Sequence, residues 1–430
     1  MFSKSPTTVT AFFLAALAWS ASAHAEIDLA ATKAEAALIE AGRKVAVAGD
    51  CIACHTVPGG KPYAGGLAME TPIGTIYSTN ITPDATTGIG PYSYDDFAAA
   101  LRRGVAKDGH NLYPAMPYPS YARVSDADMR ALYAYFMDGV DAVDQPNRGS
   151  DIPWPLSMRW PLGVWNMAFA PGEAVKAVSI ADRGAYLVEG LGHCGSCHTP
   201  RGIAFQEKAL SAADGPQFLG GGMIDGWFAK SLRNDVGHGM GDWSEDELVE
   251  FLKTGRNART AAFGGMTEVI THSTQAMDEA DLRAMARSLK ALSAAGPTYV
   301  AKGGDTAFDE LRQGKYARRG ATLYAEFCQS CHRADGQGVP RIYPALAGNS
   351  AVLPDNPAST IRVALAGGRM PVTDHGPTAF AMPGFSRLSD AELADVLSFV
   401  RGAWGNNAPA VNASEVAKTR KAFPILPARP

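Results

Sequence analysis

The strongest constraint on this chain is a five-residue motif that occurs three times. The pattern Cys-x-x-Cys-His stands at residues 51–55, 194–198 and 328–332. Two intervening residues place both sulfurs on one side of a helical turn, where each can form a thioether bond to a vinyl group of haem. The histidine that follows then reaches the iron as its proximal ligand. The sequence therefore predicts three covalently bound c-type haems, held by Cys51, Cys54 and His55, by Cys194, Cys197 and His198, and by Cys328, Cys331 and His332.

A zinc site is the main alternative for these cysteines. A Cys-x-x-Cys pair is also compatible with half of a zinc site or with a redox dithiol. Four thiolates from two motifs would suffice for a zinc ion, but the histidine after every pair would then have no role. All 6 cysteines of the chain lie in the three motifs. The sequence therefore favours haem attachment over a disulfide, a catalytic thiol or a separate metal site.

The composition is that of a soluble globular protein. Hydrophobic residues make up 46% of the 430 residues and charged residues 19%, which are ordinary values. A chain of this length has room for about two to four domains. The formal net charge of -4 gives no sign of nucleic-acid binding.

The N-terminus has the pattern of a secretory signal. Lys4 precedes an apolar stretch at residues 10–19, and small residues follow up to Ala25. This pattern predicts a signal peptide at residues 1–25, cleaved after Ala23 or Ala25. A membrane anchor is the alternative, although the apolar stretch is short for a span. Export agrees with haem attachment, because c-type haem is attached outside the cytoplasm.

An internal repeat predicts the architecture. In each copy a helix leads into the motif, a shorter helix and a glycine-bearing turn follow, and an amphipathic helix with an acidic first turn closes the unit. The expected helices cover residues 36–47, 94–103 and 129–137 in the first copy, 182–190, 244–254 and 282–289 in the second, and 315–327, 358–366 and 393–404 in the third. The sequence thus predicts a mainly α protein of three tandem domains, each a small helical bundle wrapped around one haem.

The domain boundaries follow from breaks in this repeat. After the signal peptide we expect domains at residues 26–140, 181–292 and 315–404. A linker rich in Pro and Trp at 141–180 separates the first two, and a linker with Gly-Pro and Gly-Gly breakers at 293–314 separates the last two. A tail at 405–430 carries a weak helical pattern at residues 414–423.

The sixth ligand of each iron decides whether the haem is closed for electron transfer or open to a small molecule. A methionine beside Pro or Gly follows the middle helix of every copy. Its repeated position favours ligation, although methionine is usually a core filler. The expected ligand pairs are His55–Met116, His198–Met266 and His332–Met382, with Met240 and Met370 as alternatives in the second and third copies.

A backbone acceptor is expected to orient each proximal histidine. After His332, the stretch at residues 343–348 is similar to the small cytochrome c pattern in which a proline carbonyl accepts from the histidine, and Pro344 is the candidate. The first two copies have Gly65-Gly66 and Gly220-Gly221-Gly222 instead. The sequence does not identify the acceptors for His55 and His198.

Several stretches of the chain resemble the tri-haem cytochrome c subunits of membrane-bound, quinone-linked dehydrogenases. The matching stretches are residues 60–66, 80–84, 112–117, 134–137, 157–162 and 197–202. Those at residues 224–228, 262–266 and 403–406 are most similar to the alcohol dehydrogenase branch. A different class, a haem peroxidase or reductase with one open iron, is disfavoured by the three methionines.

The resemblance implies an electron-transfer subunit that is not itself an enzyme. It would receive electrons from a pyrroloquinoline-quinone (PQQ) alcohol dehydrogenase subunit and pass them to ubiquinone. The implied location is the periplasmic face of the bacterial inner membrane, with peripheral attachment. The alternatives are a cytochrome subunit of a flavin-dependent gluconate, sorbitol or glucose dehydrogenase, or a free periplasmic electron shuttle.

The expected linker concentrates aromatic residues. Trp154, Trp160 and Trp165 lie among prolines and leucines. Such a segment fits a contact between the first two domains, and it also fits a membrane interface or a quinone pocket. Both interpretations remain open from the sequence.

Overall fold

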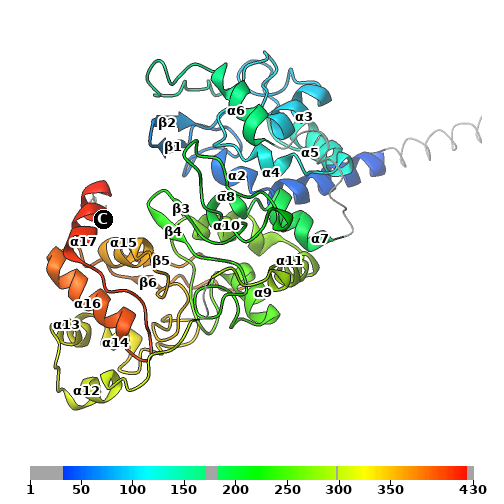
Figure 1. Ribbon diagram of the computed structural model, residues 1–430. Coiled ribbons are helices and arrows are strands. Elements are labelled where there is room, and N and C mark those ends of the chain that lie inside the picture. Colours follow the sequence, from blue (N-terminus) through cyan, green and yellow to red (C-terminus); the bar gives the residue numbers. More distant parts are fainter. Residues whose placement is uncertain (1–31, 171–181, 297–298, 424–430) are drawn as a thin grey trace, which may run out of the picture.

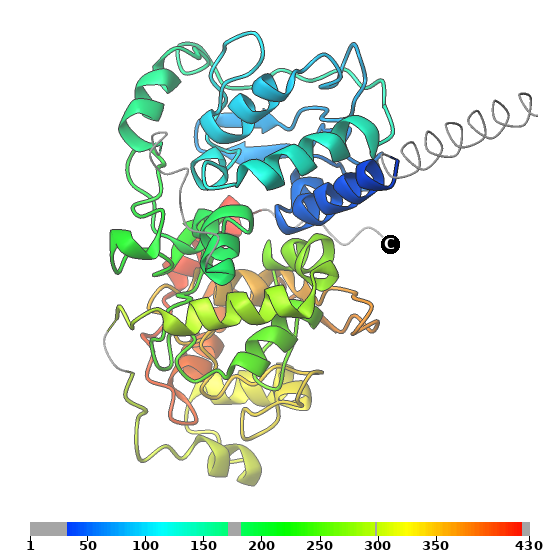
Figure 2. The ribbon, with the colours of Figure 1, turned by 90° about the vertical axis from the view of Figure 1, so that its right-hand side faces the viewer.

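The computed structural model describes residues 32–170, 182–296 and 299–423, which we call the first, second and third segments. Each segment carries one motif. Figures 1 and 2 show the second segment between the first and the third. The expected signal peptide lies outside the described residues.

Helices dominate each segment in the same order. A helix leads into the motif, and a short helix holds the motif itself. A middle helix and a closing helix follow. In the first segment these are residues 32–48, α2 (Cys51–Cys54), α3 (Tyr94–Arg103) and α5 (Asp126–Asp138). In the second they are α7 (Arg183–Ala185) continued by the π-helix η2 (Tyr186–Leu191), α8 (Gly195–His198), α9 (Glu245–Thr254) and α11 (Glu279–Ala291). In the third they are α13 (Arg319–Phe327), α14 (Gln329–His332), α15 (Ala358–Ala366) and α16 (Asp390–Gly402).

Local capping explains where several of the middle and closing helices begin. The hydroxyl groups of Ser93, Ser244 and Ser389 each accept from the backbone N–H three residues later, and the acid at that position bonds back to the serine N–H. This capping box satisfies backbone donors that the first turn leaves free. Gly104 and Gly255 end α3 and α9 in the left-handed conformation that suits glycine.

The expected helices are all present, but several of their ends differ: α5, α11 and α16 begin three residues before the expected starts, at Asp126, Glu279 and Asp390. Helices α3 and α15 have the expected bounds. Helix α13 begins at Arg319 rather than at residue 315, because Gly314 ends the preceding helix in a left-handed turn. Helix α16 ends at Gly402, two residues before the expected end.

The structure also contains elements that the repeat did not predict. They are the helices α4 (Tyr118–Tyr121), α6 (Pro161–Phe169), α10 (Met266–His272) and α12 (Ala307–Gln313), and the short helical turns η3 (Ala212–Asp214) and η4 (Thr274–Ala276). Each segment adds one antiparallel hairpin: β1 (Ala68–Thr71) with β2 (Gly74–Tyr77), β3 (Gly222–Ile224) with β4 (Trp227–Ala229), and β5 (Gly368–Arg369) with β6 (Ala381–Met382). The weak helical pattern of the tail forms α17 (Ala413–Ala422).

The buried side chains form two hydrophobic cores. One core joins residues of the first and second segments, including Phe136, Leu187 and Leu282. The third segment has its own core, which includes Leu365 and Leu397. The first two segments are therefore packed as one hydrophobic unit.

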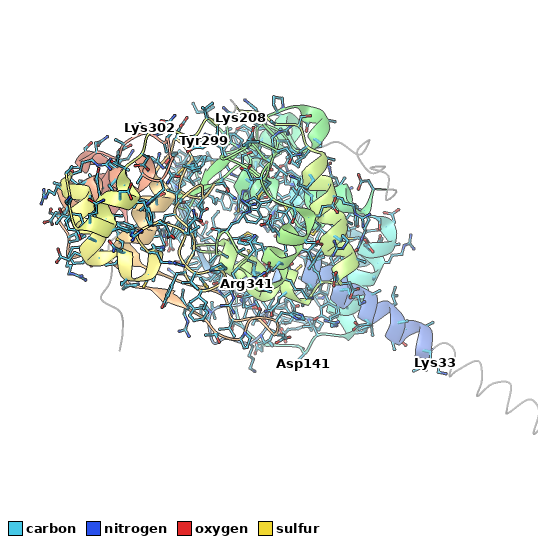
Figure 3. All side chains as sticks on the ribbon, turned by 90° about the horizontal axis from the view of Figure 1, so that it is seen from below. Lys33, Asp141, Lys208, Tyr299, Lys302 and Arg341 are labelled. Atoms are coloured by element: carbon cyan, nitrogen blue, oxygen red, sulfur yellow. The ribbon has the colours of Figure 1, made fainter. Side chains whose placement is uncertain are left out.

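The first expected linker packs against the first domain, and the second packs against the start of the tail. Asn80 donates its amide to the Val143 carbonyl at 2.7 Å, and Ile152 is buried. The Tyr299 hydroxyl and the Lys302 backbone N–H both donate to the Gly405 carbonyl, at 2.9 Å each. Figure 3 shows Tyr299 and Lys302 close together. These connections therefore act as extensions of the packed segments.

The aromatic residues of the first linker divide between surface and interior. Trp165 donates its indole N–H to the Ala204 carbonyl at 2.8 Å and packs edge-on against Tyr118. It thereby bridges the first and second segments. Trp154 and Trp160 are 80% and 70% exposed. Among the described residues, no helix combines the length and apolar character needed to cross a membrane.

Candidate haem sites

Each motif forms one helical turn that gathers its cysteines and histidine. The backbone N–H of the histidine donates to the carbonyl of the first cysteine at 3.0 Å for His55, 3.0 Å for His198 and 2.9 Å for His332. The three motifs therefore present the same local arrangement, although their intervening residues differ. This is the arrangement that two thioether bonds and one axial ligand require.

Every motif histidine directs one ring nitrogen at a backbone carbonyl. The Nδ1 atoms of His55, His198 and His332 lie 2.7, 2.7 and 2.9 Å from the carbonyl oxygens of Thr79, Lys230 and Pro344. Nδ1–H donates in this geometry, which leaves the Nε2 lone pair for a metal. Pro344 is the acceptor expected from the sequence. Thr79 and Lys230 are the two acceptors that sequence reasoning left open.

Burial keeps the motif histidines neutral. It lowers the pKa of the His55 and His332 imidazoles, and lowers the pKa of His198 to about 4. A neutral imidazole with a fixed Nδ1–H is the form that binds iron. The side chains present at all three motifs thus fit a haem c.

A glycine in the left-handed region brings the acceptor loop to each histidine. The N–H groups of Gly65, Gly221 and Gly338 donate to the carbonyls of His55, His198 and His332 at 2.7, 2.7 and 3.1 Å. Their φ values are +74°, +97° and +59°. A Cβ at Gly65 would lie 2.4 Å from the Thr79 carbonyl carbon, and one at Gly338 would lie 2.7 Å from the Pro344 oxygen.

These contacts require glycine, because a side chain would push the acceptor carbonyl away. In the sequence, the glycine stretches around Gly65 and Gly221 distinguish the first two copies from the third, which has the Pro344 pattern. In the sequence they were the available signal for where the acceptor loops begin.

Met116 and Met266 occupy equivalent positions in the first two segments. The glycine that caps the middle helix accepts from Leu112 in the first segment and from Ala262 in the second, both at 2.7 Å. Each methionine stands four residues after that donor. Both are partly buried against the shared core. The sequence context of Met266 predicts a loop, but Met266 is the first residue of helix α10.

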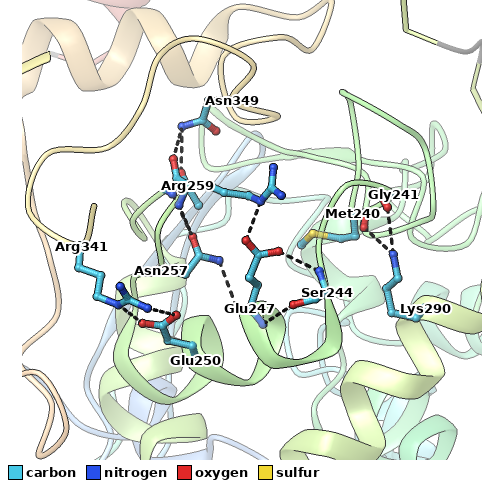
Figure 4. A network of polar contacts seen from close by, with 11 residues as sticks. Met240, Gly241, Ser244, Glu247, Glu250, Asn257, Arg259, Lys290, Arg341 and Asn349 are labelled. Carbon is cyan, nitrogen blue, oxygen red and sulfur yellow. Dashed lines mark hydrogen bonds and ion pairs between the residues drawn. The ribbon is translucent and has the colours of Figure 1, made fainter. Parts of the chain in front are cut away.

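Met240 corresponds to a core residue of the first segment. Its N–H donates to the Arg233 carbonyl at 2.7 Å, as the N–H of Ile89 donates to Thr82 at 2.8 Å. Both side chains are buried in the shared core. The Met240 carbonyl also accepts from the Lys290 ammonium at 3.0 Å (Figure 4). This equivalence favours a packing role for Met240 and leaves Met266 as the better ligand candidate.

The third motif opens into a cavity of about 350 Å³. Cys328, Cys331, His332 and Met382 all line it, and most of its other lining residues are apolar. Met370 also lines the cavity, but its sulfur lies 3.9 Å from a guanidinium nitrogen of Arg256. The geometry therefore favours Met382 as the candidate opposite His332.

Five of the motif cysteines do not have the character of thiolates. Burial raises the pKa of Cys51, Cys194 and Cys328 to about 12, and of Cys54 and Cys197 to about 11. Reactive or zinc-binding cysteines have a lowered pKa. In the described part of the chain, no group of three or more His, Cys, Asp or Glu side chains is placed to bind a metal ion. The raised pKa values weigh against a reactive dithiol.

The second and third sites share a wall. Residues 260–263 of the second segment line the cavity of the third, and Met266 follows three residues later. The Phe263 ring packs against Trp227 of the β3–β4 hairpin, with ring centroids 5.7 Å apart. On the other side, helix α10, which begins with Met266, packs against α2 of the first motif.

Comparison with known proteins agrees with this geometry. A sequence model of the cytochrome c family matches residues 39–139 and 317–404. The chain is similar to the gluconate 2-dehydrogenase cytochrome c subunit of Pantoea cypripedii, with 54% identity over 405 residues, or 91% of this chain and 92% of the relative. It is 50% identical over 404 residues to the cytochrome c subunit of alcohol dehydrogenase (quinone) from Gluconobacter oxydans, which covers 91% of this chain and 84% of the relative.

A third relative, the fructose dehydrogenase cytochrome subunit of Gluconobacter japonicus, is 37% identical over 416 residues, or 89% of this chain and 82% of the relative. The similarity thus spans nearly the whole chain and is not confined to the motifs. It confirms the resemblance drawn from the sequence: the chain belongs to the family of cytochrome c subunits of dehydrogenases.

Proposed function

We propose that the chain carries three c-type haems, one in each segment, and relays electrons from a dehydrogenase catalytic subunit to ubiquinone. The observation that carries this proposal is the histidine geometry, which is repeated at all three motifs. When bound, haem supplies one-electron redox chemistry, and the protein sets its position and potential. The three domains would have the boundaries expected from the repeat, extended by the packed linkers.

The side chains of this chain have two roles in the relay. His55, His198 and His332 each offer a free Nε2, and the backbone acceptors hold their rings in place. Met116, Met266 and Met382 would close the opposite face of each iron, because a thioether there excludes small molecules and suits electron transfer. No residue of the chain is assigned a catalytic role.

The arrangement of the segments supports a fixed relay. The second segment lies between the other two (Figures 1 and 2). It shares a core with the first segment and a cavity wall with the third. Electrons would therefore pass through the second haem.

Two catalytic partners are supported by the relatives. The sequence stretches favoured a PQQ-dependent alcohol dehydrogenase subunit. The identities of 54% to a gluconate dehydrogenase cytochrome subunit and 50% to an alcohol dehydrogenase one support both partners. Either partner would oxidise its substrate on its own chain.

The proposed location is the periplasmic face of the inner membrane, with peripheral attachment. The exposed rings of Trp154 and Trp160, with Leu156 52% exposed between them, support this placement. Aromatic side chains of this kind favour the membrane–water interface.

Reconstitution tests the proposal. The purified chain, after mass spectrometry shows three haem additions and no free thiol, is mixed with an alcohol or a gluconate dehydrogenase catalytic subunit and ubiquinone. We expect quinone reduction with one of the two subunits and no substrate oxidation by the chain alone. Substrate oxidation without any second subunit would contradict the proposal, and fewer than three haem additions would contradict the haem count.

The ligand assignment has its own test. Met266→Ala should open one iron to carbon monoxide, whereas Met240→Ala should leave all three irons closed and lower only the stability. Carbon monoxide binding by the Met240 variant instead would show that Met240 is the ligand.

A further inference from the structure

Lys230 places a cation between the second and third haem sites. Its backbone carbonyl accepts from His198 Nδ1 at 2.7 Å. Its ammonium donates to the Ser350 hydroxyl at 2.5 Å and lies 4.5 Å from the centre of the Trp243 ring. Ser350 stands between Asn349 and Ala351, which both line the cavity of the third site. One side chain therefore connects the proximal side of one site with the wall of the next.

This ammonium has no carboxylate partner among the described residues. Its contacts there are the Ser350 hydroxyl and the Trp243 ring. Both contact residues are buried, at 6% and 4% exposure. Lys230 itself is partly buried, and a cation that loses part of its hydration is stabilised when an anion or several hydrogen bonds replace it. One hydroxyl and one ring do not provide that.

Other lysines of the second segment are satisfied by the protein itself. The Lys290 ammonium donates to the carbonyls of Met240 and Gly241, at 3.0 and 3.2 Å (Figure 4). The Lys253 ammonium donates to the Met277 carbonyl at 2.9 Å. Lys230 differs because its ammonium lies between the second and third haem sites, at Ser350 and Trp243.

We propose that Lys230 binds a propionate carboxylate of the haem attached to Cys194 and Cys197. This inference rests on the proposed haem sites. Haem carries two propionates, and each needs a hydrogen-bond or charge partner where water is excluded. A charge-assisted hydrogen bond from an ammonium is among the strongest available. The Lys230 backbone already belongs to this haem site through His198, which favours the second haem over the third.

This placement makes Lys230 a residue that tunes the second haem. A fixed positive charge near a haem disfavours the oxidised, more positive state and raises its reduction potential. Removing the charge should therefore lower the potential of the second haem. The other two haems should change much less.

The test is a redox titration of the full chain, with Lys230→Gln compared with Lys253→Gln. Both variants remove one partly buried ammonium from the same segment. We expect Lys230→Gln alone to lower one midpoint potential and to shift the propionate bending band in the resonance Raman spectrum. The Met266→Ala variant shows which midpoint potential belongs to the second haem, because carbon monoxide binds that haem in this variant.

Lys230→Arg separates charge from folding. Arginine keeps the positive charge, so the midpoint potential should stay close to that of the parent chain while the Raman band shifts. If Lys230→Gln fails to bind haem, this Raman shift in Lys230→Arg still decides the proposal.

The proposal is overturned if the two glutamine variants behave alike, if the third haem shifts instead of the second, or if neither Lys230 variant changes the propionate band. Three haems with no such shift would reject the role of Lys230 alone. Fewer than three haems in the parent chain would reject the proposed haem sites themselves.

Discussion

The two junctions between segments are built differently. The first and second segments share a hydrophobic core, in which Tyr186, Leu187 and Leu191 of one segment join Leu132 and Phe136 of the other. The second and third segments keep separate cores, and polar contacts join them beside the wall at residues 260–263. Those contacts include Ser359 with the Phe228 backbone, Lys230 with Ser350, and Arg341 with Glu250.

The difference has a physical consequence for stability. A shared core unfolds with both of its halves, because neither can expose its apolar face alone. Polar contacts across a surface are worth less each and are replaced by water when they break. We therefore expect the first two segments to behave as one cooperative unit and the third to open separately.

The difference also bears on electron transfer. Fixed packing of the first two sites holds their haems at a constant separation. The polar junction instead places charged groups such as Lys230, Glu250 and Arg341 between the second and third sites. Charges act on reduction potentials over longer distances than contacts do. The apolar junction thus fixes geometry, while the polar one is suited to setting the potential difference between neighbouring haems.

The largest expected effect is the loss of a side chain from the shared core. Leu187 is fully buried there. Leu187→Ala should lower the free energy of unfolding by about 2–5 kcal/mol, the usual range for a buried leucine. Hydrogen exchange should then lose protection in both α5 and α11, which lie in different segments.

Leu365→Ala is the matched control, because Leu365 is buried at 2% exposure in the separate third core. It should reduce protection in α16 and leave α5 and α11 unchanged. If Leu187→Ala weakened the second segment alone, the first two segments would not form one cooperative unit.

Much of the fold could be predicted from the sequence where local chemistry decides. The acidic N-cap regions and the apolar spacing located the closing helices α5, α11 and α16, because both signals lie within a few residues. The β3–β4 hairpin carries a comparable local signal. Asp225-Gly226 separates its strands and adopts positive φ at both residues, +48° and +72°, as a two-residue hairpin turn requires.

The haem-site details could be predicted where a local pattern marks them, as at the motif residues and at Pro344. The motif cysteines and histidines have fixed spacing. The histidine acceptors do not, since they lie 24, 32 and 12 residues after His55, His198 and His332. The choice between Met266 and Met240 also depends on equivalent backbone bonds that no periodicity reveals. The shared core could not be predicted either, because an apolar pattern shows which face of a helix is buried but not which element covers that face.

A medium effect is expected from a single hydroxyl at the polar junction. Ser359 is buried, accepts from the Phe228 N–H at 2.8 Å and donates to the Phe228 carbonyl at 3.0 Å. Ser359→Ala leaves that N–H without a partner and should cost about 1–3 kcal/mol. Hydrogen exchange should accelerate at β4 and α15, while α5 and α11 keep their protection. A loss of protection in α5 would mean that the two junctions are coupled.

The smallest effect is expected from the ion pair at the edge of the polar junction. Arg341 binds Glu250 with two nitrogens, one of them at 3.0 Å, and is 57% exposed while Glu250 is 26% exposed (Figure 4). An exposed pair gains little, because water screens the charges and both side chains lose freedom. Arg341→Gln should therefore lower the stability of the third segment by less than about 1 kcal/mol.

That small loss should disappear in concentrated salt, where exposed charges are screened over about 3 Å at 1 M. A double-mutant cycle with Glu250→Gln, followed by urea unfolding at low and high salt, isolates the pair from other effects. A coupling energy that persists in high salt would show that the pair is part of the buried junction. The polar junction would then be as rigid as the apolar one, and the contrast between them would rest on the separate cores alone.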